Sequence, residues 1–521
     1  MGLAELVGAA GRETVEAFLE EIIRAVRQGL CDEEEGVYSA AALAFSSLQR
    51  VVGSQAVHAI LPPMLAMLRS PDPSDHAAAL RGLREAVSQR PAAVAPFLLP
   101  RLVAPPLSAA AGRALAAVAP ACGPPLYSLL DALLPPLLDA TYLEAELLPV
   151  GTDPADADPE LREALISASA AVALAVDDDN LHLLYPPILA AAAAKANPPH
   201  TRAAAAALLA QVAISGGEGH AAYLGDSLEV LVGMLDAPQA AVVRAAWSAF
   251  DSTLKTLAKE RLLLHVGSLR EALMAVGDEA RSSARKAAAA TGAAALPVTV
   301  AGLRLNKGLA PFATVYLHAL MTGSPDQREV AALALGEAVA LTPPDALKPF
   351  VIQITGPLIR IVGDRFPAGV KVAILSTLRL LIRKGATSLK PFVPQLQTTF
   401  VKALSDPSPS VRSHGAAALS ALAPLSPRVE PLATELATTA ATAEPGTQLS
   451  LLCALAGVVR RVSKSLSPEA MDKIETVARP VLTARDPDLA CAAAGVLGSL
   501  ARWRPLPELL DRVEAAGEAI G

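Results

Sequence analysis

The feature that most limits the fold of this sequence is an internal repeat of about 40 residues. The tetrapeptide Leu-Lys-Pro-Phe occupies residues 347–350 and again residues 389–392, a displacement of 42 residues. Pro357, Pro394 and Pro431 recur at intervals of 37 residues. A period of this size is typical of stacked helix pairs. The 521 residues are therefore predicted to form one long array and not three or four domains of roughly 150 residues.

The composition favours helices over strands. Hydrophobic residues make up 52% of the chain but aromatic residues only 3%, so most of the apolar content is Ala, Leu and Val. Alanine and leucine are strong helix formers, and strands are usually rich in aromatic and β-branched residues. Charged residues make up 18%, below the usual quarter. An all-α chain with closely packed helices is expected.

Within one unit the apolar residues follow the period of a helix. Between residues 347 and 362 they form a single stripe at Phe350, Val351, Ile354, Leu358, Ile361 and Val362. Residues 370–382 form a second predicted helix, apolar over a wider arc because it packs on neighbouring repeats. Gly385 then ends it, as helix C-termini prefer. Each unit therefore reads as helix, short Asp/Pro turn, helix.

The turns resemble those of the HEAT consensus, in which a turn aspartate precedes a Val-Arg or Val-Lys pair. Asp406 and Pro407 precede Val411-Arg412, Asp364 precedes Lys371, and Asp236 precedes Arg244. The resemblance implies that Arg244, Lys371 and Arg412 pair with turn aspartates of adjacent repeats. The predicted fold is an all-α, HEAT/armadillo-type α-solenoid, with about thirteen helix-pair repeats in a curved superhelix.

Two stretches interrupt the pattern of helix-pair repeats. Residues 150–159 are acidic and rich in proline, which predicts either a solvated loop or a joint between residues 1–150 and residues 151–521. Residues 278–307 hold an Ala/Gly run flanked by arginine and lysine. They are predicted to form a flexible, irregular insertion between two helices, with a basic contact loop as the alternative.

Charge and motif content exclude several functions. The formal net charge is -7, so the molecule as a whole offers nucleic acid no general attraction, and DNA is not an expected partner. We find no Gly-rich phosphate loop, metalloprotease motif or Gly-x-Ser-x-Gly nucleophile motif. The sequence therefore predicts no enzyme, no cofactor and no metal site. A structure with titratable groups converging in a cleft would argue for an enzyme instead.

Cysteine usage and hydropathy bear on the compartment. Cys31, Cys122, Cys453 and Cys491 are far apart and mostly lie in apolar helical pattern. They are predicted to be buried thiols in a reducing compartment, not disulfides or metal ligands. The first residues lack the pattern of a signal peptide. One of the longest uncharged runs, residues 287–303, contains Pro297 and falls short of about 20 strongly apolar residues, so no membrane association is expected.

Four segments resemble a known family. Residues 354–366 (Ile-Thr-Gly-Pro-Leu-Ile-Arg-Ile-Val-Gly-Asp-Arg-Phe) and 389–400 are similar to the C-terminal part of the general-control translational activators, as are residues 322–327 and 40–45. The resemblance implies a HEAT protein that sits on stalled or collided ribosomes. It also implies activation of the kinase that phosphorylates the α subunit of initiation factor two, in the response to amino-acid starvation. The family protein is several times longer, so ribosome contact is expected mainly through regions upstream.

The resemblance also implies a partner site. In that family the C-terminal region docks the RWD domain of the kinase, and an arginine there contributes. Arg360, which should project outward from its helix, and Arg365, in the turn that follows, are the two candidates. The alternative for Arg365 is pairing with Asp364 or capping the helix. The expected compartment is the cytoplasm. The alternative function is a generic HEAT scaffold of the transport-receptor or phosphatase-scaffold type, which the fold by itself does not exclude.

Overall fold

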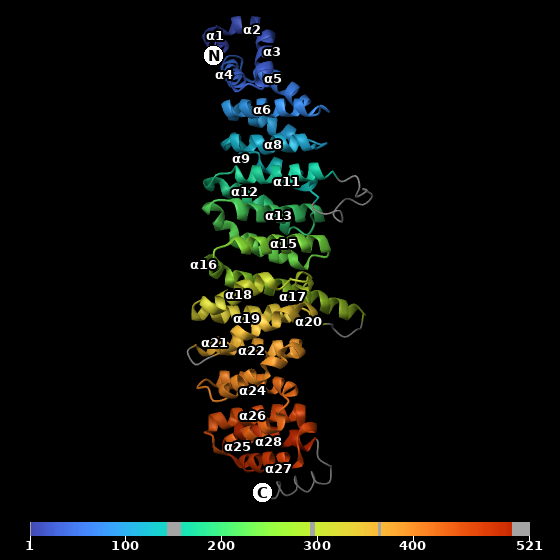
Figure 1. Ribbon diagram of the computed structural model, residues 1–521, viewed down its shortest axis with the longest axis vertical. Helices are drawn as coiled ribbons and strands as arrows, with labels where there is room; N and C mark the ends of the chain where they lie inside the picture. The colour runs from blue at the N-terminus through green and yellow to red at the C-terminus, as the bar shows by residue number, and fades with distance from the viewer. Residues whose placement is uncertain (1, 143–157, 292–296, 363–365, 503–521) are drawn as a thin grey trace. The chain divides into compact units, whose positions relative to one another are not determined.

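The computed structural model describes residues 2–142, 158–291, 297–362 and 366–502. Every regular element among these residues is an α-helix or a short 3-10 helix, and none is a strand. By its internal contacts the chain divides into two compact units, Met1–Thr256 and Leu257–Gly521. Within each unit, helix pairs stack one on the next (Figure 1). The predicted all-α, HEAT-type solenoid is confirmed.

In unit 1 each repeat has a first helix and a second helix, here called the A helix and the B helix. The A helices are α3 (Leu19–Leu30), α5 (Ser54–Met67), α7 (Pro91–Leu102), α10 (Leu130–Ala140), α12 (Leu181–Ala193) and α14 (Leu224–Gly233). The B helices are α4 (Glu35–Val52), α6 (Pro73–Gln89), α8 (Ala109–Cys122), α11 (Pro159–Leu174), α13 (Pro199–Ser215) and α15 (Ala240–Thr256). The other elements are α1 (Gly2–Ala9), α2 (Arg12–Ala17), α9 (Pro124–Tyr127), η3 (Asp178–Asn180), η4 (Glu218–Tyr223) and η5 (Met234–Asp236). Helices of each kind contact their successors, so the unit has two layers.

Unit 2 follows the same plan. Its A helices are α16 (Lys259–Leu262), α18 (Ala310–Thr322), α21 (Val351–Ile361), α23 (Val393–Ala403), α25 (Val429–Thr442) and α27 (Pro468–Ala478). Its B helices are α17 (Val266–Thr291), α19 (Pro325–Leu341), α22 (Ala368–Gly385), α24 (Pro409–Leu422), α26 (Pro445–Val462) and α28 (Pro487–Ala501). Short links are α20 (Pro344–Leu347), η6 (Leu263–His265), η7 (Gly302–Arg304), η8 (Lys348–Phe350), η9 (Ala386–Phe392), η10 (Ala423–Leu425), η11 (Ser463–Ser465) and η12 (Arg479–Thr483). Each B helix contacts the next B helix.

The turns begin many of the B helices by the same chemistry. Asp72, Asp158 and Asp486 each accept a hydrogen bond, at 2.9 Å, from the backbone N–H two residues later. A proline occupies the first helical position after each of them, where its missing N–H and fixed φ suit a helix start. Ser324 and Gln327 form a reciprocal capping box at the start of α19. The recurring Asp-Pro and Ser-Pro pairs thus set where the second helix of a repeat starts.

Small residues bring the B helices close together. A Cβ added to Gly112 of α8 would lie 3.0 Å from the Cβ of Ala164 and 3.2 Å from its backbone, in α11. A Cβ added to Gly457 of α26 would lie 2.7 Å from the Cβ of Ser420, in α24. Such spacing leaves no room for aromatic side chains at these contacts. The high alanine content and low aromatic content of the sequence are therefore what this packing requires.

Two cations link one repeat to the next in unit 2. The ammonium of Lys371 in α22 lies 2.7 Å from the carboxylate of Asp406, in the turn before α24, and both side chains are about nine-tenths buried. Arg412 donates to the backbone carbonyl of Asp406 at 3.0 Å and to the hydroxyl of Ser450, in α26, at 3.1 Å. The predicted pairing of Lys371 is confirmed. Arg412 also links repeats, but it bonds the carbonyl and not the carboxylate of the aspartate; the pairing of Arg244 stays a prediction.

One predicted irregular segment is partly helical. Residues 278–291, assigned from the sequence to the irregular insertion around residues 278–307, form the second half of α17. The prediction is wrong for these residues because an alanine-rich segment has high helix propensity even without packing. Residues 292–296 lie outside the described residues. The boundary predicted at residue 151 also lies outside the described residues. The division of the chain into two units falls between residues 256 and 257.

Candidate functional site

Arg360 lies on the exposed side of α21. The opposite side of the helix is buried through Ile354, Leu358 and Ile361, each at most 4% exposed. Arg360 follows Leu358 by two residues, which is about 200° around an α-helix, so its side chain is directed away from the core and is exposed. This exposure agrees with the sequence pattern. Its part in binding a partner stays a prediction.

The surroundings of Arg360 combine a free cation with an exposed apolar side chain. Among the residues that the structure describes, none forms a hydrogen bond or ion pair with Arg360. Ile352 lies eight residues earlier on the same helix and is 59% exposed. Residues 352, 356 and 360 are four apart, so they share one side of the helix. Arginine beside exposed apolar area is a common composition at protein–protein contact sites.

The A helices around Arg360 carry no negative charge. The sequences of α18, α21 and α23 contain no Asp or Glu, although the whole chain has a net charge of -7. Lys402 of α23 is exposed, and α21 contacts both α18 and α23. This part of the A-helix row therefore offers a positive, partly apolar surface to an acidic partner.

Lys402 and Ile352 were not identified from the sequence. The displacement of 42 residues that relates residues 347–350 to residues 389–392 also relates Arg360 to Lys402, so the repeat itself carried the signal for the second cation. Ile352 gave no such signal, because an isolated isoleucine in a helical pattern is usually buried. Arg365, the other predicted site residue, lies outside the described residues, as does Asp364.

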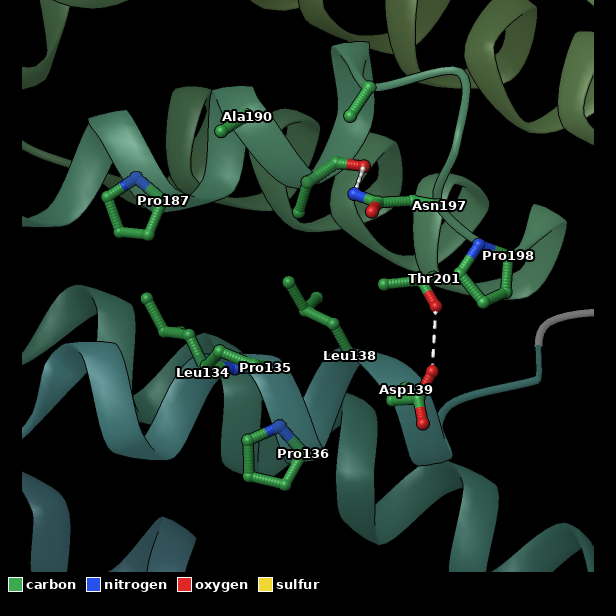
Figure 2. Close-up of a pocket in the computed structure, with 12 residues that line it drawn as sticks. Leu134, Pro135, Pro136, Leu138, Asp139, Pro187, Ala190, Asn197, Pro198 and Thr201 are labelled. Carbon is green, nitrogen blue, oxygen red and sulfur yellow. Dashed lines mark hydrogen bonds between the residues drawn. The ribbon is translucent and has the colours of Figure 1, made fainter.

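A groove of about 570 Å³ lies between α10 and α12 in unit 1. Figure 2 shows its apolar walls, formed by Leu134, Leu138, Pro135, Pro136 and Pro187, with polar side chains gathered at one end. There Asn197 donates to the carbonyl of Ala191 at 3.1 Å, and Thr201 donates to the carboxylate of Asp139 at 3.0 Å. Each of these polar side chains is bonded to a neighbouring group of the protein, and they do not converge on a point inside the groove.

Asp139, His200 and Thr201 are the residues near this groove that most resemble a catalytic group. His200 Nε2 lies 3.1 Å from the same oxygen of Asp139 that accepts the Thr201 hydroxyl. In a nucleophile–His–acid arrangement the hydroxyl donates to the imidazole that the acid orients, and in this cluster the hydroxyl donates directly to the carboxylate instead. His200 and Thr201 open α13, where a carboxylate is favourable beside the helix N-terminus. The cluster therefore joins α10 to α13.

A second buried polar pair lies in the core of unit 1. The hydroxyl of Tyr185 lies 3.1 Å from Nδ1 of His220, and Tyr223 stacks on the ring of Tyr185. Burial lowers the pKa of His220, against the charge of Asp178, which raises it. Burial also raises the pKa of Tyr185 above its ordinary value. Both groups are therefore neutral near pH 7, as a hydrogen-bonded pair inside a core requires.

The thiols and other ionisable groups form no further centre in the part of the chain that the structure describes. There, no three His, Cys, Asp or Glu side chains are placed to hold one metal ion. The four cysteines are free: Cys122 is buried and Cys31 half-buried, but Cys453 and Cys491 are exposed. The prediction of buried thiols is wrong for these last two, which lie on the accessible sides of α26 and α28. No described helix is both long enough and apolar enough to span a bilayer.

Comparison with known proteins places these features in context. Residues 94–307 match the model of the family named "Stalled ribosome sensor GCN1-like, HEAT repeats". The "eIF-2-alpha kinase activator GCN1" of Saccharomyces cerevisiae is 35% identical over 526 residues, which cover 99% of this chain and 18% of that protein. The "Stalled ribosome sensor GCN1" of Homo sapiens is 33% identical, with 98% and 18% covered. The "Protein ILITYHIA" of Arabidopsis thaliana is 35% identical, with 83% and 15% covered. The chain spans less than a fifth of the length of these relatives.

Solved structures are similar only at the level of helix stacking. Kap95p, in a structure that describes its effect on RanGDP, is 14% identical and has a TM-score of 0.38, with 99% of this chain and 69% of that chain covered. Importin beta is 13% identical with a TM-score of 0.34, and 98% and 78% are covered. These likenesses are too weak to bear on function.

Proposed function

This chain belongs to the stalled ribosome sensor GCN1-like family of HEAT-repeat proteins, and from that premise we propose that it is a non-catalytic scaffold in translational control. Family membership agrees with the resemblance seen in residues 354–366 and 389–400. In the proposed role, the A-helix surface around Arg360 binds the RWD domain of the kinase that phosphorylates initiation factor two α. The longer protein then couples stalled or collided ribosomes to activation of that kinase in the cytoplasm, during amino-acid starvation.

The observation that carries the proposal is the state of Arg360. A guanidinium that is exposed and makes no bond to a described residue adds little to folding, and its replacement typically changes stability within about 0.5 kcal/mol. It is free to form a bidentate pair with a carboxylate of a partner. Ile352 beside it and Lys402 on the neighbouring helix add apolar area and a second positive charge. The RWD contact face is accordingly expected to contain carboxylates.

The test is the affinity of the full chain for the RWD domain, measured by titration calorimetry. Arg360→Ala should weaken binding by more than about 1 kcal/mol, which is more than about fivefold in Kd, as interface arginines often do. Its melting temperature should stay unchanged. Arg365→Ala is measured beside it, because the family motif alone does not choose between the two arginines.

Arg383→Ala is the matched control. Arg383 is an exposed arginine in the last turn of α22, on the B helix of the same repeat. Its loss should leave RWD affinity unchanged, because it lies in the other helix row. If both Arg360→Ala and Arg365→Ala bind as tightly as the unmodified chain while remaining folded, the docking surface is elsewhere. If Arg383→Ala weakens binding equally, general charge and not a local site is responsible.

A further inference from the structure

Helix α17 continues well beyond the packing that supports its first half. It runs for 26 residues from Val266 to Thr291. Its buried residues end at Ala280, and none of residues 281–290 is buried. In Figure 1 its last turns extend past the ends of α18 and α19. At 1.5 Å per residue, the part after Ala280 is about 16 Å long. We call residues 281–290 the α17 arm.

The arm remains helical through its composition. Between residues 281 and 290 it contains five alanines, with serine, arginine and lysine as the other residues. Alanine, arginine and lysine have the highest helix propensities, so the segment is helical without an apolar face to bury. Most side chains of the arm are exposed, and only Arg281, Ala284 and Ala288 are partly covered.

The charge of this region is segregated from that of the rest of the molecule. Between residues 280 and 310 the sequence has five cations, Arg281, Arg285, Lys286, Arg304 and Lys307, and no Asp or Glu. The whole chain, by contrast, has a net charge of -7. Arg281 pairs with Asp278 at the base of the arm. Arg285 and Lys286 are exposed and bond no described residue.

The segment that returns from the arm is anchored and also basic. The backbone N–H of Val300 donates to the carbonyl of Leu341 in α19 at 3.2 Å, and Val300 and Leu303 are buried. Arg304 is held by a hydrogen bond to Thr299 Oγ1 at 2.8 Å and is exposed, as is Lys307. Cations thus project both from the arm and from the fixed segment that follows it.

We propose that the α17 arm, with Arg285 and Lys286 as its main contacts, binds the phosphate backbone of structured RNA. The choice of RNA rests on the proposed association with ribosomes. Phosphate contacts require cations and hydroxyl or N–H donors and no apolar anchor, and the arm supplies arginine, lysine and the hydroxyls of Ser282 and Ser283. This site is separate from the RWD surface, which lies on other helices.

The side chains of the arm argue against two other partners. A protein interface needs aromatic or large apolar anchors at its centre, and the largest apolar side chain between residues 281 and 290 is alanine. A membrane-surface helix needs an apolar face to bury among lipids, which the arm also lacks. The surface around Arg360 does have an exposed large apolar side chain, Ile352, which the arm lacks.

The test measures binding of the full chain to a fluorescently labelled RNA duplex by anisotropy, between about 50 mM and about 200 mM KCl. The double variant Arg285→Ala/Lys286→Ala should lose at least about tenfold in affinity at about 100 mM salt. The slope of log K against log salt should become shallower by about 2, or about 1 for each cation removed. The arm should stay helical, since alanine is the best helix former.

The control is the double variant Arg460→Ala/Arg461→Ala, which removes two exposed cations from the last turn of α26. Its RNA affinity should stay within about twofold of that of the unmodified chain, because an exposed cation away from the site contributes little. Equal losses in the two double variants would refute a local site, as would the absence of RNA binding by the unmodified chain at about 50 mM salt. Displacement of the RNA by polyglutamate at equal charge would mean that the arm recognises acidic protein instead. RWD affinity is measured on the same variants: its retention, together with lost RNA binding, separates this proposal from kinase docking.

Discussion

The ion pair between Lys371 and Asp406 should hold adjacent repeats of unit 2 together, and Lys371→Met tests this. The two charges are 2.7 Å apart, and the side chains are 9% and 10% exposed. Methionine keeps the apolar stem of lysine and removes the ammonium. Asp406 is then left buried without its main partner, although it still accepts the backbone N–H of Ser408 at 2.9 Å.

The expected size of the effect follows from that geometry. Breaking one half of a buried ion pair costs about 3–5 kcal/mol. The lower end applies here because Ser408 and the nearby charge of Arg412 still stabilise the carboxylate. Repeat arrays can unfold in parts, so a single midpoint is an incomplete measure. Amide exchange of α22 and α24 should therefore be followed, and a loss of about 3 kcal/mol should speed it by about two orders of magnitude.

The effect should depend on pH in a defined direction. Burial by itself would raise the pKa of Asp406. The hydrogen bonds from Lys371 and Ser408 and the charges of Lys371 and Arg412 outweigh burial and hold the pKa below its ordinary value. The carboxylate therefore contributes stability that is present above its unfolded pKa of about 3.9 and is lost as pH falls through the folded pKa. Without Lys371, less opposes the effect of burial, which raises the pKa of Asp406. The loss of stability in the variant should therefore be complete near pH 7 and become smaller below about pH 4.

Lys348→Met is the matched control. Lys348 pairs with Asp345 at the same distance of 2.7 Å, but the side chains are 60% and 92% exposed, and such surface pairs typically contribute no more than about 1 kcal/mol. If Lys371→Met exchanges at the rate of the unmodified chain or of Lys348→Met, the buried pair does not link the repeats. A deficit that persists unchanged at about pH 3, below the unfolded pKa, would mean that packing and not charge is responsible.

Two further predictions concern the cores of the units. Tyr316→Phe should leave stability unchanged or raise it by up to about 1 kcal/mol, because the buried Tyr316 hydroxyl bonds no described residue. Tyr185→Phe should instead cost about 1–3 kcal/mol, because it leaves His220 without its partner. Urea unfolding of both variants measures the two changes in stability. Gly112→Ala should destabilise unit 1 by about 1–3 kcal/mol, since its Cβ would press on the backbone of Ala164. Gly498→Ala, in open space on α28, should stabilise by about 0.4–1 kcal/mol, and equal melting temperatures for the two alanine variants would contradict the close packing of α8 on α11.

The architecture was predictable because its determinants are local. A helix pair of about 40 residues needs only a helical stripe, a turn with Asp and Pro, and a second stripe. All three recur in the sequence, and Asp406 and Lys371 even identified a contact between repeats. Properties that depend on the neighbouring layer were less accessible. The exposure of Cys453 and Cys491 depends on the side of α26 or α28 that the next helix covers, and composition does not specify this.

The extent of α17 illustrates a second limit. An alanine-rich run with few large side chains satisfies two descriptions, a disordered insertion and a helix that needs no packing. The low content of large side chains favours the first, and the structure shows the second for residues 278–291. The contact of Asp139 with Thr201, 62 residues apart, is also beyond a reading of local pattern. It depends on how α10 and α13 approach each other, which turn chemistry does not determine.

Arg360 and Lys371 show why residue type alone does not assign a role in such an array. They are 11 positions apart, in the A helix and the B helix of one repeat. Lys371 faces the next turn, where it forms a buried ion pair with Asp406. The attraction between the two charges therefore stabilises the fold. Arg360 is on the side of α21 that no described helix covers, among A helices without a carboxylate. Because a buried charge must be paired inside the protein and an exposed one need not be, burial is the property that separates cations of the scaffold from those available to a partner.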